Sequence, residues 1–205
     1  MDSHGRVLII ACGALAREIH ALRRANGWPM DVTCLAPELH NRPERIAPAV
    51  RAEIRAHRDR YRTIFVAYAE CGTLGQLDRV LAEEGVERLP GAHCYEFFAG
   101  ARTFAELADA EPGTFYLTDF LTRHFERLVI GGLGIDRHPE LAQEYFRHYR
   151  KIVHLAQEPS GALIGQARQI ASRLGLAFEH RVTGYGGLGS RLCALAERKA
   201  LTWRT

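Results

Sequence analysis

Short runs of β-branched and other apolar residues, each followed by an amphipathic segment, constrain this chain more than any other feature. Residues 6–11 (RVLIIA) are typical of a strand buried on both faces, and residues 12–28 follow with helical periodicity. The runs at 30–36 and 63–69 have the same character. Strands that alternate with helices predict right-handed crossovers and a mostly parallel sheet flanked by helices. We therefore expect an α/β fold, one three-layer domain over residues 1–205 that is Rossmann-like without being a true dinucleotide-binding fold.

The second half of the chain continues the alternation less regularly. Residues 114–130 are consistent either with a strand followed by a helix or with a helix throughout. The segment 138–156 predicts a helix, as does 161–175, and residues 176–184 predict a late strand before a closing helix over 188–200. We find no linker or low-complexity tract that would divide the chain.

Composition excludes several classes of protein. The 27 Lys and Arg against 24 Asp and Glu give a net charge of 27 − 24 = +3, and no dense basic patch alternates with aromatic residues, which argues against nucleic-acid binding. No apolar stretch is long enough to cross a membrane, and the N-terminal apolar run is too short for a signal peptide. We expect a cytoplasmic protein, in which five cysteines, an odd number, are reduced thiols.

Three of these cysteines form the leading candidate site. Cys12 and Cys71 each precede a glycine at a predicted turn from strand into helix, where the carboxyl ends of parallel strands gather ligands. Cys94 lies in the segment GAHCYEFF. Thiolates bind zinc and iron–sulfur clusters, and three protein ligands on zinc leave a coordination position open for catalysis. The alternative interpretation is that these cysteines are small buried hydrophobic residues.

Several side chains could complete such a site. His93 and Glu96 flank Cys94 and are further candidate ligands. His40 and Asn41 follow a predicted strand in the segment LHNRPE and could line the same edge, although that segment could equally be a helix entry. His40, His93 and Glu96 compete for the role of fourth ligand or general base.

A glycine-rich loop near the C-terminus is a second candidate. The segment TGYGGLGS predicts a strand, a loop and a helix, and such loops can hold a phosphate or another anion. It lacks the lysine of a P-loop and does not strictly match the dinucleotide fingerprint. The alternative is an ordinary turn. The candidate cofactor-binding residues are Gly184, Gly186, Gly187 and Gly189.

Taken together, the motifs resemble the bacterial and archaeal family DUF1638, whose function is unknown. The segments that carry the resemblance are IIACGAL, LHNRPERI, YAECGTLG, GAHCYEFFAG, PGTFYLTDFL and HYRKIV, in that order. The resemblance implies a cytoplasmic single-domain protein of a kind often encoded near corrinoid proteins and their methyltransferases. It also implies that Cys12, Cys71, Cys94, His40 and Asn41 are family positions.

These observations lead to one functional expectation and one alternative. We expect a metal-binding enzyme or accessory protein of corrinoid-dependent methyl transfer, with zinc, or less favoured an iron–sulfur cluster, as its metal. Its partner would be a small-molecule substrate or a corrinoid protein, with no nucleic acid or membrane involved, and a homo-oligomer is left open. The alternative is a non-catalytic binding or chaperone module for a corrinoid or methyltransferase partner.

Overall fold

The computed structural model describes residues 6–202 and the side chains as far as Glu197. Parallel sheets flanked by helices confirm the predicted α/β class. The strands, which we expected in one sheet, form two sheets, one in each of two compact units. The N-terminal unit comprises residues up to Cys94 together with the segment from Gly187, and the C-terminal unit is Tyr95–Gly186. The edge strand at Glu87–Arg88 in the four-stranded sheet spans only two residues. So short an edge offers few backbone groups to which a strand of another chain could bond.

The N-terminal unit holds a four-stranded parallel sheet in the order β2-β1-β3-β4. Its central strand β1 is buried at all six positions, as its unbroken apolar run predicts. The strands are β1 (Val7–Cys12), β2 (Met30–Leu35), β3 (Thr63–Ala67) and β4 (Glu87–Arg88). The helices are α1 (Ala16–Asn26), α2 (Ile46–His57), α3 (Gln76–Glu84) and most of α9 (Gly186–Thr202).

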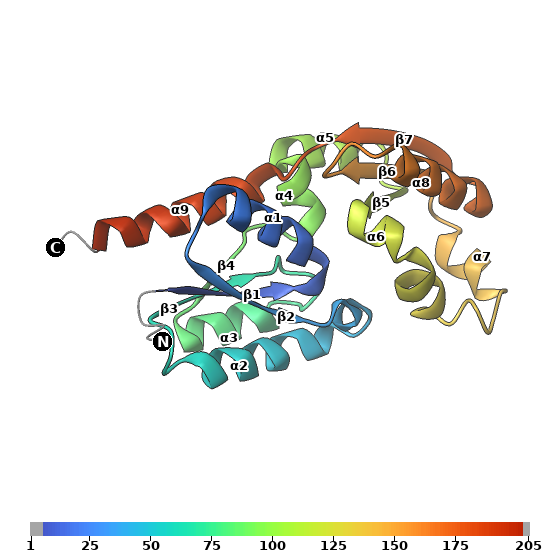
Figure 1. The fold of residues 1–205 in the computed structure, drawn as a ribbon. Helices are drawn as coiled ribbons and strands as arrows, with labels where there is room; N and C mark the ends of the chain where they lie inside the picture. Colours follow the sequence, from blue (N-terminus) through green and yellow to red (C-terminus); the bar gives the residue numbers. More distant parts are fainter. Residues whose placement is uncertain (1–5, 203–205) are drawn as a thin grey trace. The chain divides into compact units, whose positions relative to one another are not determined.

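Helices cover both faces of this sheet. Figure 1 shows α1 on one face and the neighbouring α2 and α3 on the other. Ion pairs join α2 to α3, from Arg51 to Glu83 and from Arg55 to Glu84. The chain crosses from β1 outward to β2 and then back past β1 to β3, so the strand order reverses between β1 and β3. In open α/β sheets ligands bind at the carboxyl ends of the strands beside such a reversal.

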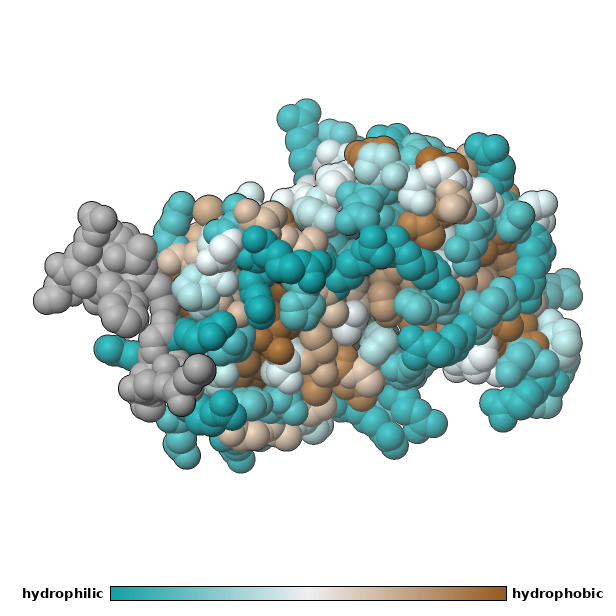
Figure 2. All heavy atoms as spheres, viewed as in Figure 1, coloured by the Kyte–Doolittle hydropathy of each residue, from teal (hydrophilic) through white to brown (hydrophobic). Residues whose placement is uncertain are grey.

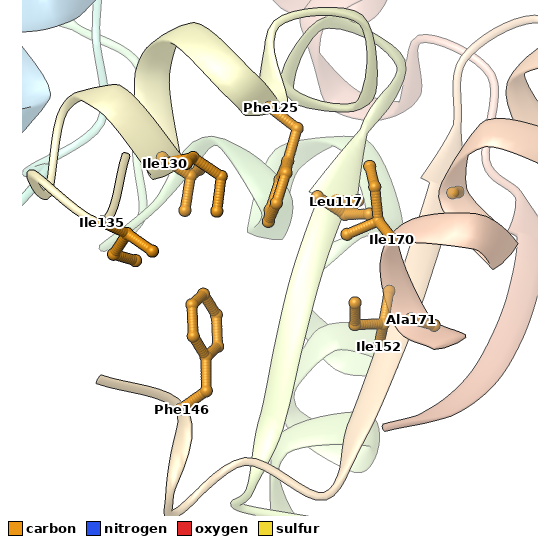
Figure 3. Packing of buried hydrophobic residues seen from close by; sticks show 10 residues of the cluster. Leu117, Phe125, Ile130, Ile135, Phe146, Ile152, Ile170 and Ala171 are labelled. Carbon is orange, nitrogen blue, oxygen red and sulfur yellow. The ribbon is translucent and has the colours of Figure 1, made fainter. Parts of the chain in front are cut away.

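The C-terminal unit holds a parallel sheet in the order β5-β6-β7. Its strands are β5 (Thr114–Thr118), β6 (Lys151–Ala156) and β7 (Ala177–Val182). Its helical segments are α4 (from Cys94 to Ala99), α5 (Ala101–Ala110), α6 (Asp119–Arg123), a π-helix (Glu126–Gly131), α7 (Leu141–Phe146) and α8 (Gly161–Leu174). Apolar side chains from β5, β6, the π-helix, α7 and α8 pack together on one face of the sheet (Figure 3). A smaller cluster around Leu107 of α5 covers the other face.

The helix predicted over 138–156 is wrong in its second half. α7 ends at Phe146, and residues 151–156 form β6 between two other strands. The run Ile152-Val153-His154-Leu155 is fully buried, and β-branched residues in a short buried run fit a central strand better than a helix. The ambiguous segment 114–130 is a strand followed by helical turns.

Among the described helices, none combines the length and apolar character that crossing a bilayer requires. In Figure 2 hydrophilic side chains cover much of the viewed face, and apolar side chains show between them.

Candidate functional site

Cys12 ends β1 at the edge where the strand order reverses. Its side chain is 3% exposed, and Sγ accepts a hydrogen bond from the backbone N–H of Ala14 at 3.3 Å. The next residue must be small, because a Cβ on Gly13 would lie 3.0 Å from the carbonyl oxygen of Leu35 and 3.0 Å from Cδ of Pro37. The Cys-Gly turn therefore packs directly against the segment that follows β2.

That segment places His40 beside Cys12. His40 lies in a short 3₁₀-helix (Pro37–Asn41), and its Nδ1 is 3.8 Å from Cys12 Sγ and 3.2 Å from the carbonyl oxygen of Pro37. From the shorter contact we assign the proton to Nδ1, which donates to Pro37 and leaves Nε2 with its lone pair. The residue is exposed, yet many protein atoms surround its ring. Their effect lowers the pKa of His40, and the charge of His93 lowers it further, whereas the hydrogen bond to Pro37 raises it.

Tyr68, which sequence analysis missed, is the third member of the group. It directly follows β3, is 1% exposed, and its ring is parallel to that of His40 with centroids 6.1 Å apart. Its hydroxyl is buried next to the Cys12 thiol but makes no hydrogen bond of ordinary geometry within the described residues. Burial raises the pKa of Tyr68 far above its usual value, and the neighbouring thiols of Cys12 and Cys71 raise it further. A polar group in a run of buried residues at a strand end was the signal that could have revealed it.

Cys71 approaches from the loop after β3. Its backbone has a φ of 54°, which is unusual for a residue other than glycine. Its N–H donates to the carbonyl oxygen of Ala92 at 2.8 Å, which ties the loop to the segment before His93 and Cys94. The side chain is half-buried. Tyr68, the second Cys-Gly turn and Cys12 thus share the carboxyl edge of neighbouring strands.

Glu70 holds this loop in place and was also missed. Its carboxylate accepts hydrogen bonds from the hydroxyl of Thr73 at 2.6 Å and from the N–H groups of Gly72 and Gly75 at 2.8 and 3.0 Å. These bonds lower the pKa of Glu70. A carboxylate bound by three donors offsets the strain of the left-handed Cys71.

The two thiols are neutral in the metal-free protein. Burial raises the pKa of Cys12 to about 12; the hydrogen bond from Ala14 opposes this rise, and a thiolate at Cys71 would raise the pKa further. Burial also raises the pKa of Cys71 to about 11, with Glu70 adding and Arg88 opposing. A nearby divalent cation would reverse this preference, because it favours the thiolates.

The remaining candidates lie as follows. Asn41 is exposed at the end of its 3₁₀-helix, and His93 is exposed just before Cys94, which is half-buried and begins α4. Glu96 is in the first turn of α4 and belongs to the C-terminal unit. Within residues 6–202 no three His, Cys, Asp or Glu side chains are grouped so that they could hold a metal ion. The convergence of Cys12, Cys71 and Cys94 on one ion stays a prediction.

Packing accounts for two of the four candidate glycines. A Cβ on Gly186, where α9 begins, would lie 2.2 Å from the carbonyl oxygen of Phe97 and 2.4 Å from that of Phe98. A Cβ on Gly189 would contact Leu22 of α1 at 3.6 Å. Gly184 adopts a φ of 60° with open space around it, and Gly187 lies inside α9.

Comparison with known proteins gives one match. A family model described as "Protein of unknown function (DUF1638)" matches residues 34–192, a range that contains His40, Cys71 and Cys94 and begins after Cys12. No curated protein and no solved structure matches the chain.

Proposed function

The chain belongs to the DUF1638 family, and because that family's description assigns no activity, we propose a function from the site itself. The N-terminal unit binds a zinc ion at the carboxyl edge of its sheet and serves a one-carbon transfer reaction. The observation that carries the proposal is the position of the His40 ring beside the buried Cys12 thiol, with Nδ1 3.8 Å from Sγ, where the strand order reverses. Nε2 is the ring nitrogen left to bind the ion, because Nδ1 is bonded to Pro37.

The chemical types of these donors suit zinc, although within the described residues no three of them are grouped around one point. Cys12 and Cys71 supply sulfur and His40 supplies an imidazole whose second nitrogen is already oriented by the Pro37 carbonyl, as is usual for a metal-binding histidine. His93 and Cys94 are the candidates for a further ligand, since the Ala92 backbone is bonded to Cys71. Zinc supplies Lewis acidity, which lowers the pKa of a thiol or water that it contacts.

The surrounding residues prepare the site. Tyr68 buries one side of the thiols, and its hydroxyl, which makes no hydrogen bond of ordinary geometry within the described residues, could donate to a bound substrate. Glu70 fixes the backbone that carries Cys71, so the thiol needs little reorganisation when a ligand arrives. A methyl group on a corrinoid partner is the electrophile that we propose, on the basis of the family resemblance alone.

Metal analysis tests this proposal. Protein purified without oxygen should contain zinc, and a colourless solution would argue against the iron–sulfur alternative. Cys12→Ala and Cys71→Ala should each weaken zinc binding by about 10-fold or more, measured by competition with a chromophoric chelator. Cys193→Ala is the matched control, because this thiol faces Glu197 on α9. If both variants bind zinc as tightly as the control, the zinc site is not here.

One observation favours a binding module as second candidate. Leu74 follows the Cys71 turn with a φ of 53° and is 87% exposed. The basis for this second candidate is the strained backbone of Leu74, which the loop holds in solvent beside the site. Leu74→Ser should then weaken binding of a purified cobalamin-loaded corrinoid protein and leave zinc content unchanged, whereas unchanged binding would exclude this role for Leu74.

A further inference from the structure

A second cluster of reactive side chains lies in the C-terminal unit and is independent of the thiol site. It begins at Asp119, the first residue of α6, directly after β5. Asp119 is 1% exposed, and its Oδ2 accepts hydrogen bonds from the backbone N–H groups of Gln157 and Glu158 at 3.2 and 2.9 Å. The side-chain oxygen of Gln157 in turn accepts from the Asp119 N–H at 2.9 Å. This carboxylate is fixed in position and cannot rotate without breaking several bonds.

Two histidines extend from Asp119 toward the edge of the sheet. His154 of β6 is completely buried, and its Nε2 lies 3.0 Å from Asp119 Oδ1. His180 is directly opposite His154 on the edge strand β7, with the two Nδ1 atoms 3.2 Å apart. Both ring nitrogens of His154 are therefore engaged, whereas Nε2 of the half-buried His180 has no partner within the described residues.

For two neutral imidazoles, the bonding pattern determines where the protons lie. Oδ1 of an ionised carboxylate can only accept, so the proton between Asp119 and His154 belongs to His154 Nε2. Nδ1 of a neutral His154 then accepts, and the proton of His180 must lie on its own Nδ1. Consequently Nε2 of His180 carries a lone pair. The same logic orients the histidine of a Ser-His-Asp triad.

The surroundings of the cluster keep Asp119 ionised and His180 neutral. Burial would raise the pKa of Asp119, but hydrogen bonds from His154 and Glu158 outweigh it, the charge of Arg123 on α6 adds to them, and the net pKa is lowered. Burial and His154 lower the pKa of His180 while Asp119 opposes them. On the side of α8, the guanidinium of Arg168 lies over the ring of Phe178, which shares a strand face with His180.

A buried charged network is an expensive way to stabilise a sheet. The neighbouring positions on the same face, Leu117, Ile152 and Phe178, are apolar and pack in the core, so apolar residues suit this surface. Burying an ionised carboxylate costs free energy even when it is hydrogen-bonded, and apolar residues of similar size carry no such cost. Buried titratable groups with shifted pKa values therefore favour a reactive role over a purely structural one.

We infer that Asp119, His154 and His180 form a proton relay, in which Nε2 of His180 is the general base for a small molecule that carries an acidic hydroxyl or thiol group. The O–H or S–H bond breaks, its proton binds Nε2, and the electron pair stays on the oxygen or sulfur. The two imidazoles share the positive charge, and Asp119 remains ionised and stabilises it. His154 and Asp119 are positioning residues.

Tautomers provide the first test, on the full wild-type chain. Nitrogen-15 NMR of histidine-labelled protein at neutral pH should show His154 protonated at Nε2 and His180 protonated at Nδ1. A His180 ring with its proton on Nε2 would overturn the inference, whatever the behaviour of any variant.

Chemical modification provides the second test. Diethyl pyrocarbonate acylates an unprotonated imidazole nitrogen, so His180 should be modified, and peptide mass spectrometry identifies the site. In Asp119→Asn the amide N–H would donate to His154 Nε2, which moves the proton of His154 to Nδ1 and that of His180 to Nε2. Modification of His180 should then fall by about 10-fold or more, because the free lone pair is lost.

Matched controls distinguish loss of the relay from a general loss of structure in the variant. Asp136→Asn changes an exposed carboxylate in the same unit and should leave the rate at His180 unchanged, and exposed His138 is the internal reference in every sample. If Asp119 has only a structural role, His180 should be modified faster in Asp119→Asn, because loss of the Asp119 hydrogen bonds loosens the local structure and exposes the His180 ring. If that variant does not fold, the pH profile of wild-type modification decides: a plateau above the pKa of His180 supports the relay, and no reaction at any pH refutes it.

Discussion

Substitution of Gly186 tests whether the glycine loop before α9 serves packing or ligand binding. An alanine Cβ at this position would lie 2.2 and 2.4 Å from the carbonyl oxygens of Phe97 and Phe98, which are backbone atoms of α4 and cannot rotate away as a side chain can. The residue also has a φ of 47°, a left-handed conformation that costs a non-glycine residue about 1–2 kcal/mol. Relief of the overlap adds about 1–3 kcal/mol, so Gly186→Ala should lower the free energy of unfolding by about 3 kcal/mol.

Gly184→Ala is the matched control. Its φ of 60° carries the same conformational cost, but nothing lies within 4 Å of the new Cβ, so we expect a loss of about 1–2 kcal/mol. Urea unfolding followed by circular dichroism should separate the two midpoints by about 1 M, given ordinary denaturant slopes. Equal midpoints for the two variants would refute the packing argument and return Gly186 to the candidate anion-binding residues.

Three further predictions concern ionisable side chains. Glu70→Ala should cost about 1–3 kcal/mol and speed hydrogen exchange across residues 71–75, because it removes the acceptor for three donors; unchanged exchange would show that the loop holds itself. The folded pKa of Asp119 is lowered, so its contribution to stability is present above the unfolded value of about 3.9 and is lost as the pH falls through the folded value. Urea midpoints of the wild type should therefore fall with acid more steeply than those of Asp119→Asn, and parallel curves would contradict this. In metal-free protein near pH 7.5, the raised pKa of Cys12 should make alkylation by iodoacetamide about 10³-fold slower than in the urea-unfolded chain, followed by mass spectrometry; equal rates would show an accessible thiolate.

The two candidate sites differ in how their polar groups are satisfied. At the thiol site the hydroxyl of Tyr68 makes no hydrogen bond of ordinary geometry within the described residues and two thiols are held neutral by burial, so the site gains from a cation or a polar ligand. In the relay both carboxylate oxygens of Asp119 and both ring nitrogens of His154 are bonded, and Nε2 of His180 has no partner among the described residues. The first arrangement suits binding and the second suits proton transfer.

Local pattern alone determined the N-terminal sheet and the place of two cysteines in it. The apolar runs of β1 and β3 are long enough and bounded by clear enough turns to be recognised as strands, and any residue that ends such a strand lies at the carboxyl edge of a parallel sheet. Cys12 and the Cys71 turn therefore share an edge for a reason visible in the sequence. The same reasoning failed for residues 151–156, because a short apolar run satisfies helical and strand periodicity equally well.

Only the tertiary structure decided which side chains meet. Cys12 and His40 are 28 residues apart, and their contact depends on the close packing of Gly13 against Pro37 after the first crossover. His154 and His180 are joined by strand register, and a shift of one residue would turn them to opposite faces of the sheet. Composition and periodicity carry no information on register or on the packing of a turn, because both follow from the fit of the whole core.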